Sequence, residues 1–318
     1  GKARKMFRKT KEGALAEHSI VGILGFLMRR GEMRLPTKKE RDMEYYINTM
    51  NLIKRYGKES LVRIKEGGVF LTEKGRKLAE NIFSASKNSE ITYGSELKTR
   101  ASPKKVIQEL QKTYKKFSPR KELDQAPLLP ASATAKIAYA IKRGDVDGKR
   151  IVWIGDDDFL SIILAITGKP KEILVLDVDP KVLKIIRDFS KKSKIKIRVL
   201  KRDLRKPIPQ KLKGKYDTAF FWSSDTEIGF SLFASRSIEL LNKRGVIYAN
   251  ITPIWCHPIE LFGIRRRISD VNLKITDFVQ NSGSYIFNRK RWNVDLIRMQ
   301  KTSRSKPLYT IFRGKIPF

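Results

Sequence analysis

The sequence is poor in the residues that build disulfides and metal sites. Its 318 residues include one cysteine and two histidines. A single cysteine, Cys256, excludes an internal disulfide and a zinc site built from cysteines. His18 and His257 are too few for a histidine-rich metal site, so we expect no bound metal. No segment is apolar enough to predict a membrane span, and the basic N-terminus lacks the apolar core of a signal peptide. These absences favour a cytoplasmic protein without a membrane partner.

Acidic residues are scarce relative to basic ones. The chain has 68 Lys and Arg against 33 Asp and Glu, a formal net charge of +35. Ion-pair networks of thermophilic surfaces need Glu alongside Lys, so pairing does not absorb this excess. Positive charge attracts phosphate, and we therefore predict ribosomal RNA and ribosomal proteins as partners, and a ribosome-associated location. The residues predicted to contact RNA are Lys2, Arg4, Lys5, Arg8, Lys9, Lys191, Lys192, Lys194, Lys201, Arg202, Arg205, Arg265, Arg266, Arg267, Arg289, Lys290 and Arg291.

The chain is predicted to have an α/β fold in four parts. They are a basic arm (1–12), a winged helix-turn-helix domain (13–84), a basic linker with a helix (85–125) and a Rossmann-like domain with a basic C-terminal region (126–318). The first domain is predicted from two helical patterns, at 20–28 and 37–55, and a hairpin at 61–71 with a Gly-Gly turn. The stretch Leu71–Gly75 resembles the junction between wing and helix in winged-helix domains.

Residues 135–255 alternate short apolar runs with helical patterns, which is typical of a parallel α/β sheet. Beyond them we expect a helix and a terminal antiparallel pair formed by 274–278 and 308–312. The strands of the parallel sheet are expected at about 151–154, 173–176, 195–200, 216–221 and 245–249.

Acids follow three of the expected strands: Asp156–Asp158 after the first, Asp177 and Asp179 after the second, and Asp203 after the third. Ligands of such sheets bind at the carboxyl ends of the strands, and an acid after the second strand suits ribose hydroxyls. Three acids after Gly155 reject pyrophosphate and favour a cationic ligand, and their mutual repulsion raises a pKa so that one can act as a base. The alternative is that these acids only cap the next helix, although one would suffice.

Several motifs, in the same order, resemble the branched-chain polyamine synthases of archaea and thermophiles. That family consists of aminopropyltransferases with an N-terminal winged-helix domain, which move an aminopropyl group from decarboxylated S-adenosylmethionine to the internal nitrogen of spermidine. The matching motifs are Asp124-Gln125, Arg143-Gly144-Asp145, Gly148-Lys149, Ile154–Asp158, Leu176–Asp179 and Tyr216-Asp217. The resemblance implies that Asp158 accepts the proton and Asp157 contacts the substrate. It implies that decarboxylated S-adenosylmethionine contacts Gly155, Asp156, Asp177 and Asp179, with Asp177 at the ribose.

Two segments depart from the family pattern. Trp222–Asp225 stands where the family has an Asp-Pro-Pro type of motif, and Pro130–Ser132 replaces a Pro-Glu-Thr segment and loses its acid. Together with the net charge, these departures favour an RNA-binding, ribosome-associated protein on a repurposed aminopropyltransferase fold, with weakened or lost catalysis and no cofactor. The first alternative is an active branched-chain polyamine synthase, for which a homodimer is an option. The second is an S-adenosylmethionine-dependent RNA methyltransferase.

Overall fold

The computed structural model describes 32–34, 57–58, 60–66, 68–77, 103–193, 196–224, 226–252, 264, 267–287 and 290–313. The chain divides into two compact units. The smaller unit comprises Gly1–Ser89 and Cys256–Arg266, and the larger one Glu90–Trp255 and Arg267–Phe318.

The described part of the smaller unit contains an antiparallel sheet with the strand order β1-β3-β2. Its strands are β1 (Glu32–Arg34), β2 (Val62–Lys65) and β3 (Gly68–Leu71). The predicted hairpin is confirmed, and Thr72 caps the helical turn that follows by accepting a hydrogen bond from the Gly75 amide at 3.1 Å. The helices predicted at 20–28 and 37–55 lie outside the described residues, so the winged-helix domain stays a prediction.

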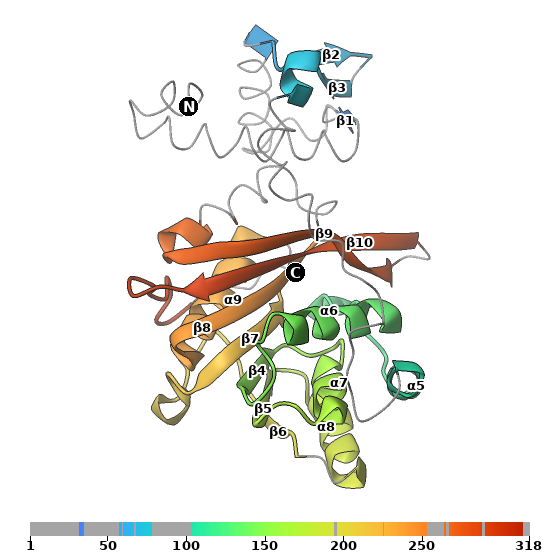
Figure 1. Ribbon diagram of the computed structural model, residues 1–318, viewed down its shortest axis with the longest axis vertical. Helices are drawn as coiled ribbons and strands as arrows, with labels where there is room; N and C mark the ends of the chain where they lie inside the picture. Colours follow the sequence, from blue (N-terminus) through green and yellow to red (C-terminus); the bar gives the residue numbers. More distant parts are fainter. Residues whose placement is uncertain are drawn as a thin grey trace. The chain divides into compact units, whose positions relative to one another are not determined.

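The larger unit is built on a seven-stranded sheet with the order β6-β5-β4-β7-β8-β10-β9 (Figure 1). The first five strands in this order are parallel, and β10 runs antiparallel to both of its neighbours. Since β4 pairs with both β5 and β7, the strand order reverses there, as it does in Rossmann-like sheets. The predicted Rossmann-like fold is confirmed. The strands are β4 (Arg150–Ile154), β5 (Glu172–Asp177), β6 (Arg198–Lys201), β7 (Tyr216–Trp222), β8 (Leu241–Ile251), β9 (Leu273–Phe287) and β10 (Lys290–Lys301).

Helices cover the sheet and follow the predicted pattern. Figure 1 shows α6, α7 and α8 together on one side of the strands, while α9 packs against β7 and β8. The helix α8 is amphipathic and buries Val182, Leu183 and Ile186, whereas α7 is apolar almost all round because helices and strands enclose it. The helices are α5 (Pro103–Tyr114), α6 (Pro130–Lys142), α7 (Leu160–Thr167), α8 (Pro180–Ser193) and α9 (Glu227–Leu240).

The antiparallel end of the sheet differs from the prediction. Residues 308–312 do not form a strand; β9 pairs instead with β10, which also pairs with β8. Two charged residues, Asp295 and Arg298, interrupt the apolar pattern of β10 but are both buried. Because of these two charges, the sequence does not indicate that β10 is a central strand with a paired strand on each side.

The segment that follows β10 is held by a buried arginine on α9. Arg236 donates to the carbonyl oxygens of Leu204 at 2.6 Å and Tyr309 at 2.8 Å. The Phe312 amide donates to the Arg205 carbonyl oxygen at 3.1 Å. The C-terminal segment is thereby joined to the loop after β6.

Three aromatic rings stack across neighbouring strands in the core. Trp153 on β4 lies parallel to Phe220 on β7, with ring centroids 4.4 Å apart, and Phe220 stacks on Tyr248 of β8 at 4.9 Å. All three side chains are buried. This aromatic row spans the middle of the sheet, next to the strand ends that carry the acids.

Candidate active site

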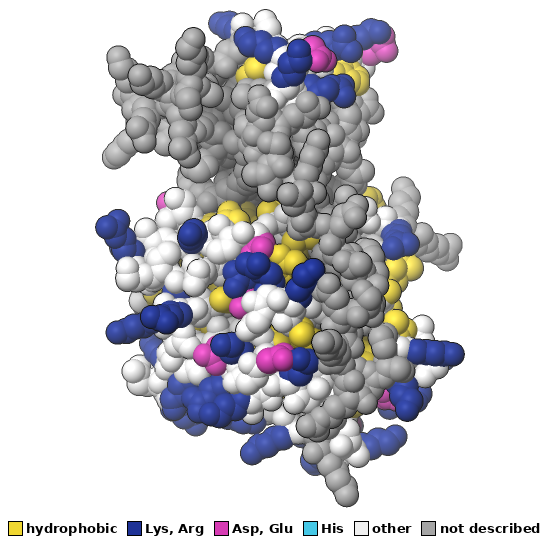
Figure 2. Space-filling view, viewed as in Figure 1, with side chains coloured by type: hydrophobic (Ala, Val, Ile, Leu, Met, Phe, Trp, Pro, Cys, Tyr) yellow, Lys and Arg dark blue, Asp and Glu magenta, His cyan; other side chains and the backbone are white. Residues whose placement is uncertain are grey.

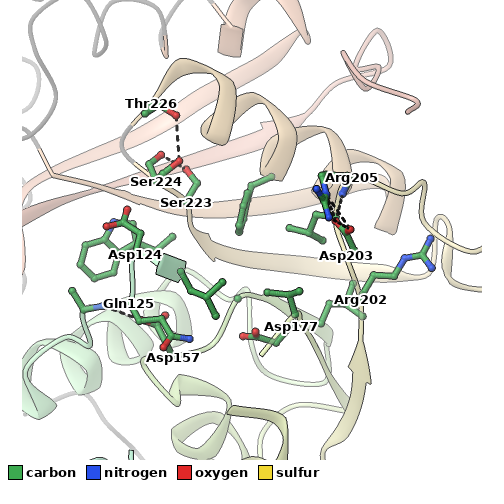
Figure 3. Close-up of a pocket in the computed structure, with 18 of the residues that line it drawn as sticks. Asp124, Gln125, Asp157, Asp177, Arg202, Asp203, Arg205, Ser223, Ser224 and Thr226 are labelled. Carbon is green, nitrogen blue, oxygen red and sulfur yellow. Dashed lines mark hydrogen bonds and ion pairs between the residues drawn. The ribbon is translucent and has the colours of Figure 1, made fainter. Parts of the chain in front are cut away.

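A pocket of about 700 Å³ lies at the carboxyl ends of the parallel strands (Figure 3). Gly155 after β4 and Ser223 after β7 both line it, so the pocket lies at the point where the strand order reverses. This is the position at which open α/β sheets bind their ligands. The other lining residues are Leu123, Asp124, Gln125, Ala126, Asp157, Leu176, Asp177, Val178, Arg202, Asp203, Leu204, Arg205, Trp222, Ser224, Thr226, Phe233 and Tyr285.

The three acids after β4 do different things. Asp157 lines the pocket, and its Oδ2 accepts a hydrogen bond from the Ala126 amide at 3.1 Å. Asp156 is fully buried and caps α7 by accepting from the amides of Leu160 and Ser161 at 2.8 and 3.2 Å. The alternative that these acids only cap the next helix therefore applies to Asp156, whereas Asp157 and Asp158 remain candidates for a ligand site.

Asp158 lies behind the pocket wall and is 2% exposed. Its Oδ1 accepts from the Leu128 amide at 2.6 Å. The Tyr114 hydroxyl donates to the carbonyl oxygens of Leu128 at 2.8 Å and Asp158 at 3.1 Å. The segment that contains Ala126 and Leu128 thus fixes two adjacent carboxylates.

The acids after β5 are tied to the same segment. Asp177 lines the pocket and accepts from the amides of Asp156 at 3.0 Å and Asp179 at 2.7 Å. Asp179 is buried behind it and accepts from Gln125 Nε2 at 3.1 Å. Because these bonds join residues from three of the matching motifs, the motifs form one site.

The backbone around the acids adopts conformations that few residues tolerate. Gly155 has a φ of +70°, which a glycine adopts without strain. Phe159, at the start of α7, has a φ of +53°, a strained conformation for a bulky side chain. Its ring is buried and packs edge-on against Phe117 at 5.1 Å. Core packing therefore holds the turn that presents the acids.

Burial raises the pKa of the acid cluster, and the mutual repulsion that the sequence predicts is a smaller cause. The pKa values of Asp156 and Asp157 lie well above the ordinary value, mainly because of burial and secondarily because of nearby acids, Asp158 in particular. Burial raises the pKa of Asp158 to about 6, against the attraction of Lys136 and the Leu128 amide. The pKa of Asp177 is also raised by burial. The cluster is therefore short of positive charge, and a bound cation would relieve it.

Lys136 is a residue of this cluster that sequence reasoning missed. It is 2% exposed, and its Nζ lies 5.0 Å from the centroid of the Trp153 ring. Burial lowers its pKa to about 8, although the three acids after β4 act in the opposite direction. Its signal in the sequence is a single charge within the otherwise uncharged run 130–141.

Hydroxyl groups form the opposite edge of the pocket. Figure 3 shows Ser223, Ser224 and Thr226 facing Asp124 and Gln125. The Thr226 side chain caps α9 by accepting from the Gly229 amide at 3.1 Å. Ser223 and Ser224 belong to the segment that departs from the family pattern; Asp225 lies outside the described residues.

The other departing segment has a structural function. Pro130 begins α6, where proline lacks no needed hydrogen bond. Ser132 Oγ accepts from the Ser284 amide of β9 at 2.9 Å. Ser132, in this departing segment, therefore joins α6 to the antiparallel end of the sheet.

Those of the basic residues predicted to bind RNA whose side chains the structure describes have different surroundings. Lys191, Lys192 and Lys201 are exposed, whereas Arg202 and Arg205 line the pocket, where Arg205 makes a bidentate pair with Asp203 at 2.6 to 3.0 Å. On the face shown in Figure 2, Lys and Arg side chains are scattered. Elsewhere, Arg267 pairs with Asp270 and Arg291 donates to Ser284, and only the backbone of Lys290 is described. Lys2, Arg4, Lys5, Arg8, Lys9, Lys194, Arg265, Arg266 and Arg289 lie outside the described residues.

The described ranges lack two kinds of feature. They contain no group of three or more His, Cys, Asp or Glu side chains placed to bind a metal ion. They also contain no helix with the length and hydropathy needed to span a bilayer.

The chain is similar in sequence to enzymes of polyamine synthesis. Residues 105–310 match the branched-chain polyamine synthase A C-terminal domain. The N(4)-bis(aminopropyl)spermidine synthase of Methanocaldococcus jannaschii is 30% identical, over 74% of this chain and 69% of its own length. An uncharacterized protein of the same organism is 32% identical over 72% of this chain, and the match spans 59% of that relative's length.

The chain is also similar to a solved structure. The branched-chain polyamine synthase from Thermus thermophilus, crystallised with N4-aminopropylspermidine and 5′-methylthioadenosine, has a TM-score of 0.65. The two proteins are 20% identical, and the match covers 94% of this chain and 91% of the other.

The prediction of an RNA-binding, ribosome-associated protein is wrong, because the named relatives are aminopropyltransferases. The prediction treated the net charge of the whole chain as decisive. Exposed charges act through water and salt, whereas the buried carboxylates set the potential inside the pocket. A basic surface and an acidic site are therefore compatible.

Proposed function

The chain belongs to the branched-chain polyamine synthase family, and we propose that it is an active aminopropyltransferase. It transfers an aminopropyl group from decarboxylated S-adenosylmethionine to the internal nitrogen of spermidine. The observation that carries the proposal is the buried acid cluster, in which Asp157 and Asp177 line the pocket with raised pKa values. Such a pocket favours cations, and both substrates are cationic.

In the reaction, the attacking amine nitrogen forms a bond to the aminopropyl carbon while the bond from that carbon to sulfur breaks. The electron pair goes to sulfur, which leaves as 5′-methylthioadenosine, and the nitrogen loses a proton. We assign the proton to Asp158, whose pKa of about 6 leaves it ionised at neutral pH. Asp157, which lines the pocket, contacts the amine. A cation at Asp157 offsets the repulsion that Asp158 exerts on it.

The donor lies on the other side of the pocket in this proposal. Asp177, at the end of β5, accepts hydrogen bonds from the ribose hydroxyls with the lone pairs that its two amide donors leave free. Gly155 lets the backbone approach the donor because it has no side chain. Arg205 neutralises Asp203 at the far end.

We also propose that residues 13–84 form the winged-helix domain expected of the family. The hairpin of β2 and β3 would be its wing. Gly75 supports this arrangement, since a side-chain Cβ there would lie 1.9 Å from the Leu61 carbonyl oxygen. The turn after the wing thus packs tightly against Leu61, the residue before β2.

The test is incubation of the purified chain with spermidine and decarboxylated S-adenosylmethionine, with products identified by mass spectrometry. We expect 5′-methylthioadenosine and aminopropylated spermidine in equal amounts, and no methylated product with S-adenosylmethionine. Asp177→Asn should raise the KM for the donor about tenfold, the cost of roughly one hydrogen bond to a charged group. Asp188→Asn, which changes an exposed acid paired with Lys184, is the control and should leave KM unchanged. A folded parent protein that forms neither product contradicts the proposal.

A further inference from the structure

Lys136 is a buried cation whose ammonium group lacks a hydrogen-bond partner in the described part of the chain. It lies on α6 and is 2% exposed. Its Nζ lies 5.0 Å from the ring centroid of Trp153 and 5.9 Å from that of Phe220. A lysine in such a place is rare, since lysines are almost never fully buried unless paired.

The two rings do not offset the loss of water around this ammonium group. Burying an ion costs more free energy than a desolvated cation–π contact returns, even after relaxation of the protein. The remaining stabilisation comes from Asp158, Asp156 and Asp157, in that order of strength. Lys136 is therefore tied electrostatically to the acid cluster, without a direct ion pair.

Lys136 in turn affects the ionisation of the acids. Lys136 is the charge that most favours the ionised form of Asp158. The Tyr114 hydroxyl points to the backbone carbonyl of Asp158, and its own pKa is raised well above the ordinary value, so it stays neutral. On the remaining sides Lys136 meets the uncharged rings of β4 and β7.

We propose that Lys136 is a positioning residue that keeps Asp158 ionised, so that this carboxylate can take the proton released in aminopropyl transfer. The inference rests on the proposed function. A cation inside the core is suited to this role because it is not screened by salt and does not line the pocket, where it would repel cationic substrates. Lys136 thus compensates the negative charge of the acid cluster without occupying the pocket wall.

The first experiment is the pH dependence of kcat/KM for aminopropyl transfer. Lys136→Met keeps the length of the side chain and removes its charge, so the acidic limb of the profile should move up by about one pH unit or more. Activity below that limb then falls roughly tenfold, while activity on the alkaline plateau is retained. Lys136→Arg restores the charge and should return the limb toward its original position.

Lys301→Met is the matched control. Lys301 is a half-buried lysine of the same unit, but its Nζ donates to the carbonyl oxygens of Ile238 and Leu241, both at 2.8 Å, and it does not line the pocket. Its removal should leave the acidic limb in place. Circular dichroism checks that each variant is folded, and Lys136→Leu replaces Lys136→Met if the latter does not fold.

A second readout does not need turnover: the titration of the Asp158 side-chain carboxyl by NMR in protein labelled with ¹³C-aspartate, with Asp158→Asn used for assignment. We expect Lys136→Met to raise the pKa of Asp158. If the parent turns over substrate but neither the limb nor this titration moves, the inference is overturned and the proposed function stands. If the parent shows no turnover, the proposed function fails, and the Asp158 titration alone decides whether Lys136 keeps this carboxylate ionised.

Discussion

Two buried cations contact opposite ends of the same aromatic row, and they are treated differently by the fold. Arg298 lies 6.0 Å from the Tyr248 ring centroid and makes a bidentate pair with Asp145, at 2.8 and 3.1 Å. Lys136 lies over Trp153 at the other end and makes no hydrogen bond within the described residues. The charge of Arg298 is neutralised by its partner Asp145, whereas the charge of Lys136 acts on Asp158 without a direct ion pair.

The difference separates charges that hold the fold from charges that serve a site. The Asp145 pair joins α6 and β4 to β10 through geometry that satisfies both partners. The acids near Lys136 instead keep raised pKa values, because burial and mutual repulsion are not fully offset. Perturbed groups of this kind cluster at functional sites. The two ends of the aromatic row differ in whether the buried charges are neutralised by a partner, and not in the number of charges.

The largest expected effect is on catalysis at the Lys136 end. Asp158→Asn should lower kcat by about 10²- to 10⁴-fold, the usual contribution of a positioned general base, while the circular dichroism spectrum stays unchanged. The matched control is Asp147→Asn, which alters an exposed acid paired with Lys169 outside the pocket. Full activity in Asp158→Asn would remove this acid from the mechanism.

At the other end, the expected effect is on stability. Arg298→Met leaves the Asp145 carboxylate buried without its cation, and breaking such a pair costs about 3–5 kcal/mol of unfolding free energy. Denaturant titration measures the change. The double variant Asp145→Asn/Arg298→Met should regain part of this loss, because no uncompensated charge remains. A loss below about 1 kcal/mol in the single variant would mean that the pair is not structural.

The pH dependence of stability sharpens the comparison. Because the folded pKa of Asp158 is about 6 and the ordinary value is 3.8, its protonated form stabilises the fold below about pH 4. This stability is lost as the pH rises through 6. Relative to the parent, Asp158→Asn should gain on the order of 3 kcal/mol of unfolding free energy between pH 4 and pH 8. Parallel stability curves for the two proteins would contradict this shift.

The smallest expected effect concerns an edge of the pocket away from both cations. Thr226→Val removes the side-chain cap of α9 and should cost about 1 kcal/mol of unfolding free energy. Thr226→Ser keeps the capping oxygen and is the control. Neither change should move the acidic limb of the pH profile, since neither alters a charge. A shift of the acidic limb would mean that the hydroxyl groups at this edge also affect the ionisation of the acid cluster.

Much of the fold could be predicted because the parallel strands are strongly apolar and short. The run at β4 is buried over Ile151–Ile154 and reads as a strand without further context. The strand β10 could not be predicted, since Asp295 and Arg298 look exposed in sequence and are buried only when the sheet is complete. Their burial depends on residues far apart in the chain.

The acids of the site could be predicted from their place after the strands, but their context could not. Lys136 looks like a surface residue of α6 until the aromatic row forms beneath it. The departure at Trp222–Asp225 suggested a damaged pocket, yet its described residues line the pocket with hydroxyl groups. The functional prediction failed because the net charge of a chain does not say where in the structure each charge lies.

The bond from Phe312 to the Arg205 carbonyl oxygen has a consequence for how the protein is made. Leu204 and Arg205 form one edge of the pocket, and one of the groups that hold this edge, the Phe312 amide, belongs to the segment after β10. A ribosome adds about 5–20 residues each second, from the N-terminus onward. The nascent chain therefore carries its complete set of acids for several seconds before that edge can close. This edge of the pocket is completed late in synthesis, after most of the sheet has been made.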